Sequence, residues 1–192
     1  MYRVLRSEWA GSRRGRPPDL RNLNRHFRIL TCGTCPGSWR ARLIKSPKVY
    51  VADPGLACHL LGIETAAELA RSPFRGPLFE GFIASEIAKA QVNAGGRREI
   101  YHFRDEQGLE VDFLVPGRRG AVTLVECKST RTPTPAHAAP MRKLAAALAG
   151  KRGKLTAVEA FLVHEPARGG TTTQAVAPGV RAVPWPDFVA AL

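Results

Sequence analysis

Two neighbouring strand-like segments carry charged residues at positions where a sheet usually buries apolar side chains. In the first, EVDFLV, Asp112 lies on the face opposite Val111 and Phe113, because successive residues of a strand alternate between the faces of a sheet. In the second, VTLVECK, Glu126 and Lys128 share one face. If the two segments pair as a hairpin, Asp112 faces the same way as Glu126. The pattern therefore predicts two carboxylates and an ammonium group gathered on one sheet.

The segments around this hairpin predict an α/β fold. A helix begins at Pro77 and runs to about Val92, with apolar residues repeating at helical spacing. Asp53 is expected to cap a helix that starts at Pro54, and Asp187 a last short helix. We expect strands at 48–52, 99–103, 110–115, 122–128, 158–163 and 180–183, further helices at 65–70 and 138–148, and a loop at 166–174. The order helix, three strands, helix, strand indicates a mixed sheet with flanking helices.

The positive charge of the chain is concentrated at its N-terminal end. The net charge is +13, and the first 50 residues hold 12 of the 29 Lys and Arg residues but 2 of the 16 Asp and Glu residues. This basic arm is expected either to contact nucleic-acid phosphates or to form a solvated tail. The residues expected to bind nucleic acid are Arg40, Arg42, Lys45 and Lys48. We divide the chain into a poorly ordered arm at 1–40, a lead-in at 41–76 and a main domain at 77–192.

The apolar segments exclude a membrane protein with spanning helices. No apolar run approaches the roughly 18 residues that cross a bilayer, and the basic N-terminus lacks the apolar region of a secretory signal. We expect a cytoplasmic protein with no membrane partner.

The carboxylate pair on the predicted sheet needs a compensating charge. A divalent cation is one such charge, and carboxylate oxygens suit Mg²⁺ or Mn²⁺. Lys128 would then steady an attacking water or the negative charge that develops on phosphate. The alternative is a structural salt bridge between Glu126 and Lys128 at an exposed edge. The Glu-x-Lys spacing alone favours that salt bridge, whereas the preceding helix and the strand with Asp112 favour a site.

Six short motifs occur in an order typical of one protein family. They are Lys45-Ser46-Pro47-Lys48-Val49-Tyr50, Asp53-x-Gly55-Leu56, Leu78-Phe79-Glu80, Phe103-Arg104-Asp105, Glu110-Val111-Asp112-Phe113 and Glu126-Cys127-Lys128-Ser129. Together they resemble the domain of unknown function 4143 (DUF4143), found at the C-terminal end of many prokaryotic AAA+-type ATP-binding proteins. That family looks like a branch of the PD-(D/E)xK nuclease superfamily. The resemblance covers about residues 41–148 and implies a restriction-endonuclease-like fold.

The resemblance also implies a set of site residues. Glu80 matches the helix acid, Asp112 the strand acid, and Glu126 with Lys128 the third motif. These four are the implied catalytic residues, and Asp112, Glu126 and Glu80 are the implied metal ligands. Glu86 matches a second acidic position on the same helix. Because Glu86 lies near the centre of the predicted apolar stripe and Glu80 at its margin, the helix acid stays open between them.

Two residues have a second interpretation. If Glu86 faces the core, it needs a partner such as Arg104 or Lys128, or a raised pKa, so it is either a site residue or half of a buried structural pair. Arg104 is expected either to contact phosphate or to form a salt bridge with Asp105 or a site carboxylate.

The sequence leaves two main functions open. The first is hydrolysis of DNA phosphodiester bonds with Mg²⁺ or Mn²⁺. The second is a non-catalytic accessory domain that binds nucleic acid or protein beside an AAA+-type ATPase partner. No Gly-rich phosphate-binding motif is present, so we expect no ATP site in this chain. The oligomeric state is not predicted.

Overall fold

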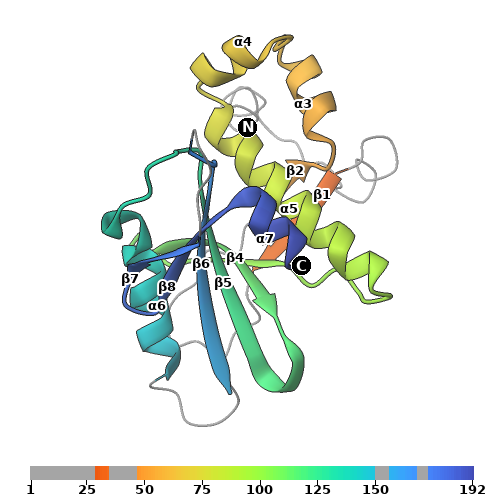
Figure 1. Cartoon of the computed structure of the whole chain (residues 1–192). Coiled ribbons are helices and arrows are strands. Elements are labelled where there is room, and N and C mark those ends of the chain that lie inside the picture. The colour runs from red at the N-terminus through yellow and green to blue at the C-terminus, as the bar shows by residue number, and fades with distance from the viewer. Residues whose placement is uncertain (1–28, 35–46, 150–155, 168–172) are drawn as a thin grey trace.

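The computed structural model describes residues 29–34, 47–149, 156–167 and 173–192 (Figure 1). Within these ranges, eight strands form one sheet in the order β2-β1-β3-β4-β5-β6-β8-β7. The strands are β1 Ile29–Thr34, β2 Lys48–Val51, β3 Tyr101–Arg104, β4 Glu110–Pro116, β5 Ala121–Lys128, β6 Ala157–His164, β7 Gln174–Ala177 and β8 Val180–Pro184. The helices are α3 Pro54–Leu60, α4 Ala66–Arg71, α5 Arg75–Asn93, α6 Ala139–Ala149 and α7 Trp185–Ala190, with 3-10 turns at Arg118–Gly120 and Pro135–Ala138.

The sheet is mixed, as the order of the elements predicted. Strands β3, β4 and β5 form an antiparallel meander, whereas β5, β6 and β8 run parallel. The parallel pairing of β5 with β6 needs a crossover connection, which α6 provides. This arrangement confirms the α/β fold class with flanking helices.

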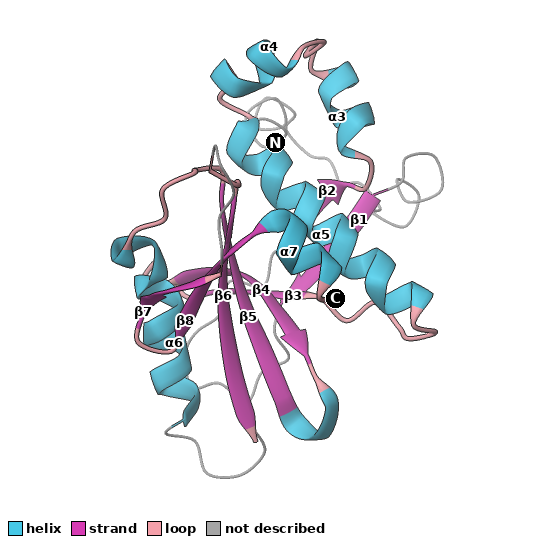
Figure 2. Cartoon of the chain, viewed as in Figure 1, coloured by secondary structure: helices cyan, strands magenta, loops and turns pink. Residues whose placement is uncertain are grey.

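Helices cover both faces of the sheet (Figure 2). On one face, α5 and α7 pack against a core that includes Ile83, Ile87 and Phe188. On the other, α6 packs through Met141 and Leu144 onto a second core. Helices α3 and α4 lie at the N-terminal end of α5. None of the helices in the described ranges combines the length and apolar character that crossing a bilayer requires.

Local signals place the short helices before α5. The backbone N–H of Leu56 donates to the Asp53 carboxylate at 3.0 Å, so Asp53 caps α3 as predicted, and Pro54 occupies its first turn. Thr65 and Glu68 form a reciprocal capping box at the start of α4.

Three expectations differ from the structure. Strand β1 lies within the segment at 1–40 that we expected to be poorly ordered; residues 1–28 and 35–40 lie outside the described residues. Strand β7 begins at the end of the predicted loop at 166–174 and was not predicted. Asp187 lies in the first turn of α7, and Pro184 takes the capping position, because the helix begins two residues before Asp187.

The packing of α5 gives a stability prediction. Replacing the fully buried Ile87 with Ala is expected to lower the free energy of unfolding by about 2–5 kcal/mol, because lost contacts and a residual cavity both destabilise the core. Val92 on the same helix is 53% exposed, so Val92→Ala is the matched control, with an expected change below about 0.5 kcal/mol. Urea unfolding followed by circular dichroism measures both. Equal losses at the two positions would contradict this packing.

Candidate active site

Asp112 lies where the regular pairing of β4 is interrupted. The register of β3 against β4 shifts between Tyr101 and Phe103, which is a β-bulge or similar irregularity. Val111 consequently packs in the core beside α6, and Phe113 packs in the core beside α5. The expectation that Val111 and Phe113 share one face is therefore wrong. A bulge re-aims the side chain beside it, and here that side chain is Asp112.

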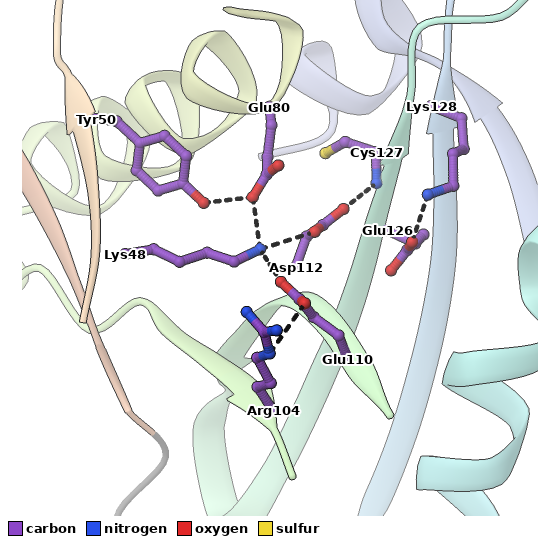
Figure 3. A network of polar contacts seen from close by, with 9 residues as sticks. All are labelled: Lys48, Tyr50, Glu80, Arg104, Glu110, Asp112, Glu126, Cys127 and Lys128. Carbon is purple, nitrogen blue, oxygen red and sulfur yellow. Dashed lines mark hydrogen bonds and ion pairs between the residues drawn. The ribbon is translucent and has the colours of Figure 1, made fainter. Parts of the chain in front are cut away.

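Glu126 lies across from Asp112, one step beyond the last paired residues of the two strands. The paired stretch of β4 and β5 ends at Phe113 and Val125. Beyond it, the backbone N–H of Cys127 donates to Asp112 Oδ2 at 2.9 Å (Figure 3). A carboxylate thus takes the place of a backbone acceptor, and the two strands separate there into a fork that holds charged side chains.

A lysine occupies one side of this fork. Lys48 Nζ on β2 lies 2.7 Å from Glu80 Oε1, 2.8 Å from Glu110 Oε1 and 3.0 Å from Asp112 Oδ1. The hydroxyl of Tyr50, on the same strand, also donates to Glu80 Oε1 (Figure 3). Burial alone would lower the pKa of Lys48, but the charges of Asp112 and Glu80 outweigh it and raise that pKa. Lys48 is therefore a firmly protonated counter-ion to three carboxylates.

Lys48 is also one of the residues that we predicted to bind nucleic acid. In the structure its side chain is mostly buried and its ammonium group is bonded to carboxylates. The other predicted phosphate-binding residues, Arg40, Arg42 and Lys45, lie outside the described residues.

Glu126 and Lys128 form a pair on the other side of the fork. Lys128 Nζ lies 2.7 Å from Glu126 Oε1, and the lysine side chain is 37% exposed. Glu126 Oε2 is buried and has no hydrogen-bond partner among the described residues. Burial, followed by the nearby charge of Asp112, raises the pKa of Glu126 to about 7 despite the opposing effect of Lys128. Glu126 is thus a buried carboxylate whose positively charged neighbours do not offset the cost of its burial.

The helix acid that reaches the cluster is Glu80. Burial raises its pKa first, the charge of Asp112 adds to the rise, and Lys48 opposes it. Glu86 does not join the cluster, because it forms an ion pair with Lys89 on the same helix rather than with Arg104 or Lys128.

Arg104 forms the salt bridge with a site carboxylate that was one of its two expected roles. Its Nε lies 3.6 Å from Glu110 Oε2. Sequence reasoning missed Lys48, Tyr50 and Glu110 as members of the cluster. The missed signal was the two-residue spacing of Lys48 with Tyr50 and of Glu110 with Asp112, which puts each pair on one side of its strand.

The cluster suits a metal site with two protein carboxylates rather than the three that the resemblance implied. In the part of the chain that the structure describes, no group of three or more His, Cys, Asp or Glu side chains could hold a metal ion. The implied ligand Glu80 is bonded instead to Lys48 and Tyr50. Asp112 is bonded to Lys48 as well, through Oδ1, and would have to release that bond to bind a metal. With Glu126 it offers two carboxylates, and Mg²⁺ commonly takes one or two and keeps its other ligands as water. The buried Glu126 Oε2, which accepts no bond from a described residue, suits such a ligand.

The pKa of Glu126 gives a pH-dependent stability prediction. The folded chain keeps the Glu126 proton up to about pH 7, whereas the unfolded chain releases it near its ordinary value of 4.5, so stability is lost as the pH rises between these values. Glu126→Gln has no proton to release. From about pH 5 to pH 8, the free energy of unfolding of the variant is therefore expected to rise by about 2–3 kcal/mol relative to that of the wild type.

Urea unfolding at the two pH values measures this gain, with the exposed Glu64→Gln as a control that should track the wild type. A constant difference between Glu126→Gln and wild type would show that the carboxyl is not held in this environment.

Comparisons with known proteins place the chain in a family. The domain of unknown function DUF4143 matches residues 75–186, which is more than half of the chain. Uncharacterised proteins of Mycobacterium bovis and Mycobacterium tuberculosis are each 34% identical to it over 90 residues. That match covers 47% of this chain and 19% of each relative, so the chain spans a small part of their length. No solved structure matches it. On its sequence match, the chain belongs to the DUF4143 family.

Proposed function

We propose that this domain hydrolyses phosphodiester bonds of DNA with Mg²⁺ or Mn²⁺, as a PD-(D/E)xK-type nuclease. One observation carries the proposal. At the fork of β4 and β5, Asp112 and Glu126 occupy opposing positions. Glu126 is paired with the partly exposed Lys128 and keeps one buried oxygen without a partner among the described residues. Acids whose ionised form is destabilised by burial and a charged neighbour are common at functional sites.

Asp112, Glu126 and Lys128 have distinct roles in this reaction. Asp112 is held in place by the Cys127 N–H, so it keeps a fixed direction toward the fork. Glu126 acts as a carboxylate once its proton has been lost. Lys128, whose side chain is partly exposed, can turn its ammonium group from Glu126 toward a phosphate oxygen or an attacking water, where a positive charge lowers the energy of the transition state.

The overall chemistry is the addition of water across a phosphorus–oxygen bond. The water oxygen bonds to phosphorus, the bond to the leaving oxygen breaks, and that oxygen takes up a proton. A divalent cation held by Asp112 and Glu126 would polarise the phosphoryl oxygen and make a bound water more acidic.

The charge of the chain supports DNA as the substrate. The net charge of +13 would attract a polyanion, and the phosphate backbone accounts for most non-specific affinity of proteins for DNA. An AAA+-type ATPase partner is part of the same proposal. It follows from the family resemblance, and the matched region is 19% of each mycobacterial relative, which leaves room for further domains in those proteins.

A non-catalytic binding domain is the second candidate, and Lys48 favours it. Its ammonium group already supplies positive charge to Glu80, Glu110 and Asp112, so these carboxylates have a counter-ion without a metal. In that case the fold would dock DNA or a protein without cutting it.

A nicking assay separates the two candidates. With Mg²⁺ or Mn²⁺, the wild-type protein is expected to convert supercoiled plasmid to nicked or linear forms. Lys128→Ala is expected to lower the rate by at least about a hundredfold, because it removes the charge beside the reacting phosphate. Lys143→Ala, which removes an exposed lysine of α6, should leave the rate unchanged.

Equal cleavage by wild type and Lys128→Ala would end the nuclease proposal. Salt-sensitive DNA binding with no cleavage, and with little effect of Asp112→Asn on binding, would favour the binding domain instead.

A further inference from the structure

Lys48 contacts three carboxylates of the acidic cluster. A lysine ammonium carries three N–H groups. Its three carboxylate contacts, at 2.7, 2.8 and 3.0 Å, come from α5 and from two positions of β4. The lysine therefore sits at the point where Glu80, Glu110 and Asp112 converge, which is a position that suits a cation (Figure 3).

The charge balance of the cluster leaves little room for a second cation. With all groups ionised, four carboxylates face three cationic side chains, so the cluster carries one net negative charge. These groups are Glu80, Glu110, Asp112 and Glu126, with Lys48, Arg104 and Lys128. A divalent cation added to this set would leave a net positive charge in a partly buried space, and like charges at short range repel. The positive charge of Lys48 also acts on Glu126, where it lowers the pKa of the carboxyl.

Lys48 can move its ammonium group while Tyr50 keeps β2 packed against the core. It is the first residue of β2, a four-residue strand at the edge of the sheet. Its side chain is long and unbranched, so its ammonium group can leave Asp112 by rotation alone. Asp112 keeps its bond to the Cys127 N–H when that happens.

We propose that Lys48 is a tethered cation that competes with the divalent metal for Asp112, so that metal binding requires its ammonium group to withdraw. Lys48 thereby sets the metal affinity of the site. It is a positioning residue rather than a catalytic one. The inference rests on the metal site of the proposed function, but it concerns binding and is tested without DNA.

The first test measures Mn²⁺ binding to the metal-free chain by calorimetry. Lys48→Met keeps most of the side-chain volume and removes the charge. Its dissociation constant for Mn²⁺ is expected to be lower than that of the wild type by at least about tenfold, because one competing positive charge has gone. The control Lys143→Met removes an exposed lysine of α6 and should match the wild type. Unchanged or weaker binding in Lys48→Met, or no binding in either protein, would overturn the inference.

Lys48→Met leaves three carboxylates without their shared counter-ion and could fail to fold, so a second variant repeats the test. The double variant Lys48→Met with Glu80→Gln removes one positive and one negative charge, so the cluster keeps its net charge. It retains Asp112 and Glu126 and should also bind Mn²⁺ more tightly than the wild type. Circular dichroism establishes that each variant is folded, and wild-type affinity in the folded double variant would again overturn the inference.

A third measurement uses the wild-type chain. Limited acetylation with acetic anhydride, read by mass spectrometry, reports how accessible each lysine is. Adding Mg²⁺ at constant ionic strength is expected to raise labelling of Lys48 severalfold while Lys143 stays constant. No rise at Lys48 would count against displacement. Displacement without plasmid cleavage would leave this inference standing and remove the nuclease proposal, whereas cleavage without displacement would do the reverse.

Discussion

The contacts of Lys48 fix how the edge of the sheet joins its centre. Lys48 lies on β2, whereas Glu80 on α5 and Asp112 on β4 follow it by 32 and 64 residues in the sequence. These carboxylates are largely buried, and burying them without a cation would be strongly unfavourable. At Gly81, a Cβ atom would lie 3.4 Å from the ring of Tyr50, so the missing side chain lets β2 approach the helix. The position of β2 and the ionisation of the acids therefore depend on each other.

At the fork of β4 and β5, regular strand pairing ends and charged side chains take its place. The bulge sends Val111 and Phe113 into opposite cores and leaves Asp112 free to accept the Cys127 N–H. A continued ladder would pair these backbone groups and bury apolar side chains in place of charges. Instead, Glu126 is held where its ionised form is unfavourable. Such a loss of stability is common at functional sites.

The elements that the sequence predicted are those with local causes. The cap at Asp53, the helix α5 and the strands of the meander depend on neighbours within a few residues or on regular periodicity. Strand β1 depends instead on pairing with β2 and, in parallel, with β3, far along the chain. The bulge at Asp112 has the same character, because strict alternation hides it. Lys48 was not assigned to the cluster for a similar reason, since its spacing with Tyr50 places both on one side of a strand but does not identify the distant carboxylates that they contact.

The position of Lys48 also bears on what the functional unit is. The family match begins at residue 75, so it contains Glu80, Asp112, Glu126 and Lys128 but leaves out β2. A segment cut at that boundary would keep every acid of the cluster and lose the cation that contacts three of them. Such a piece would have to find another cation, unfold locally or keep its acids protonated. The lead-in strand is therefore part of the site in physical terms, and the smallest piece that can hold these charges begins before β2.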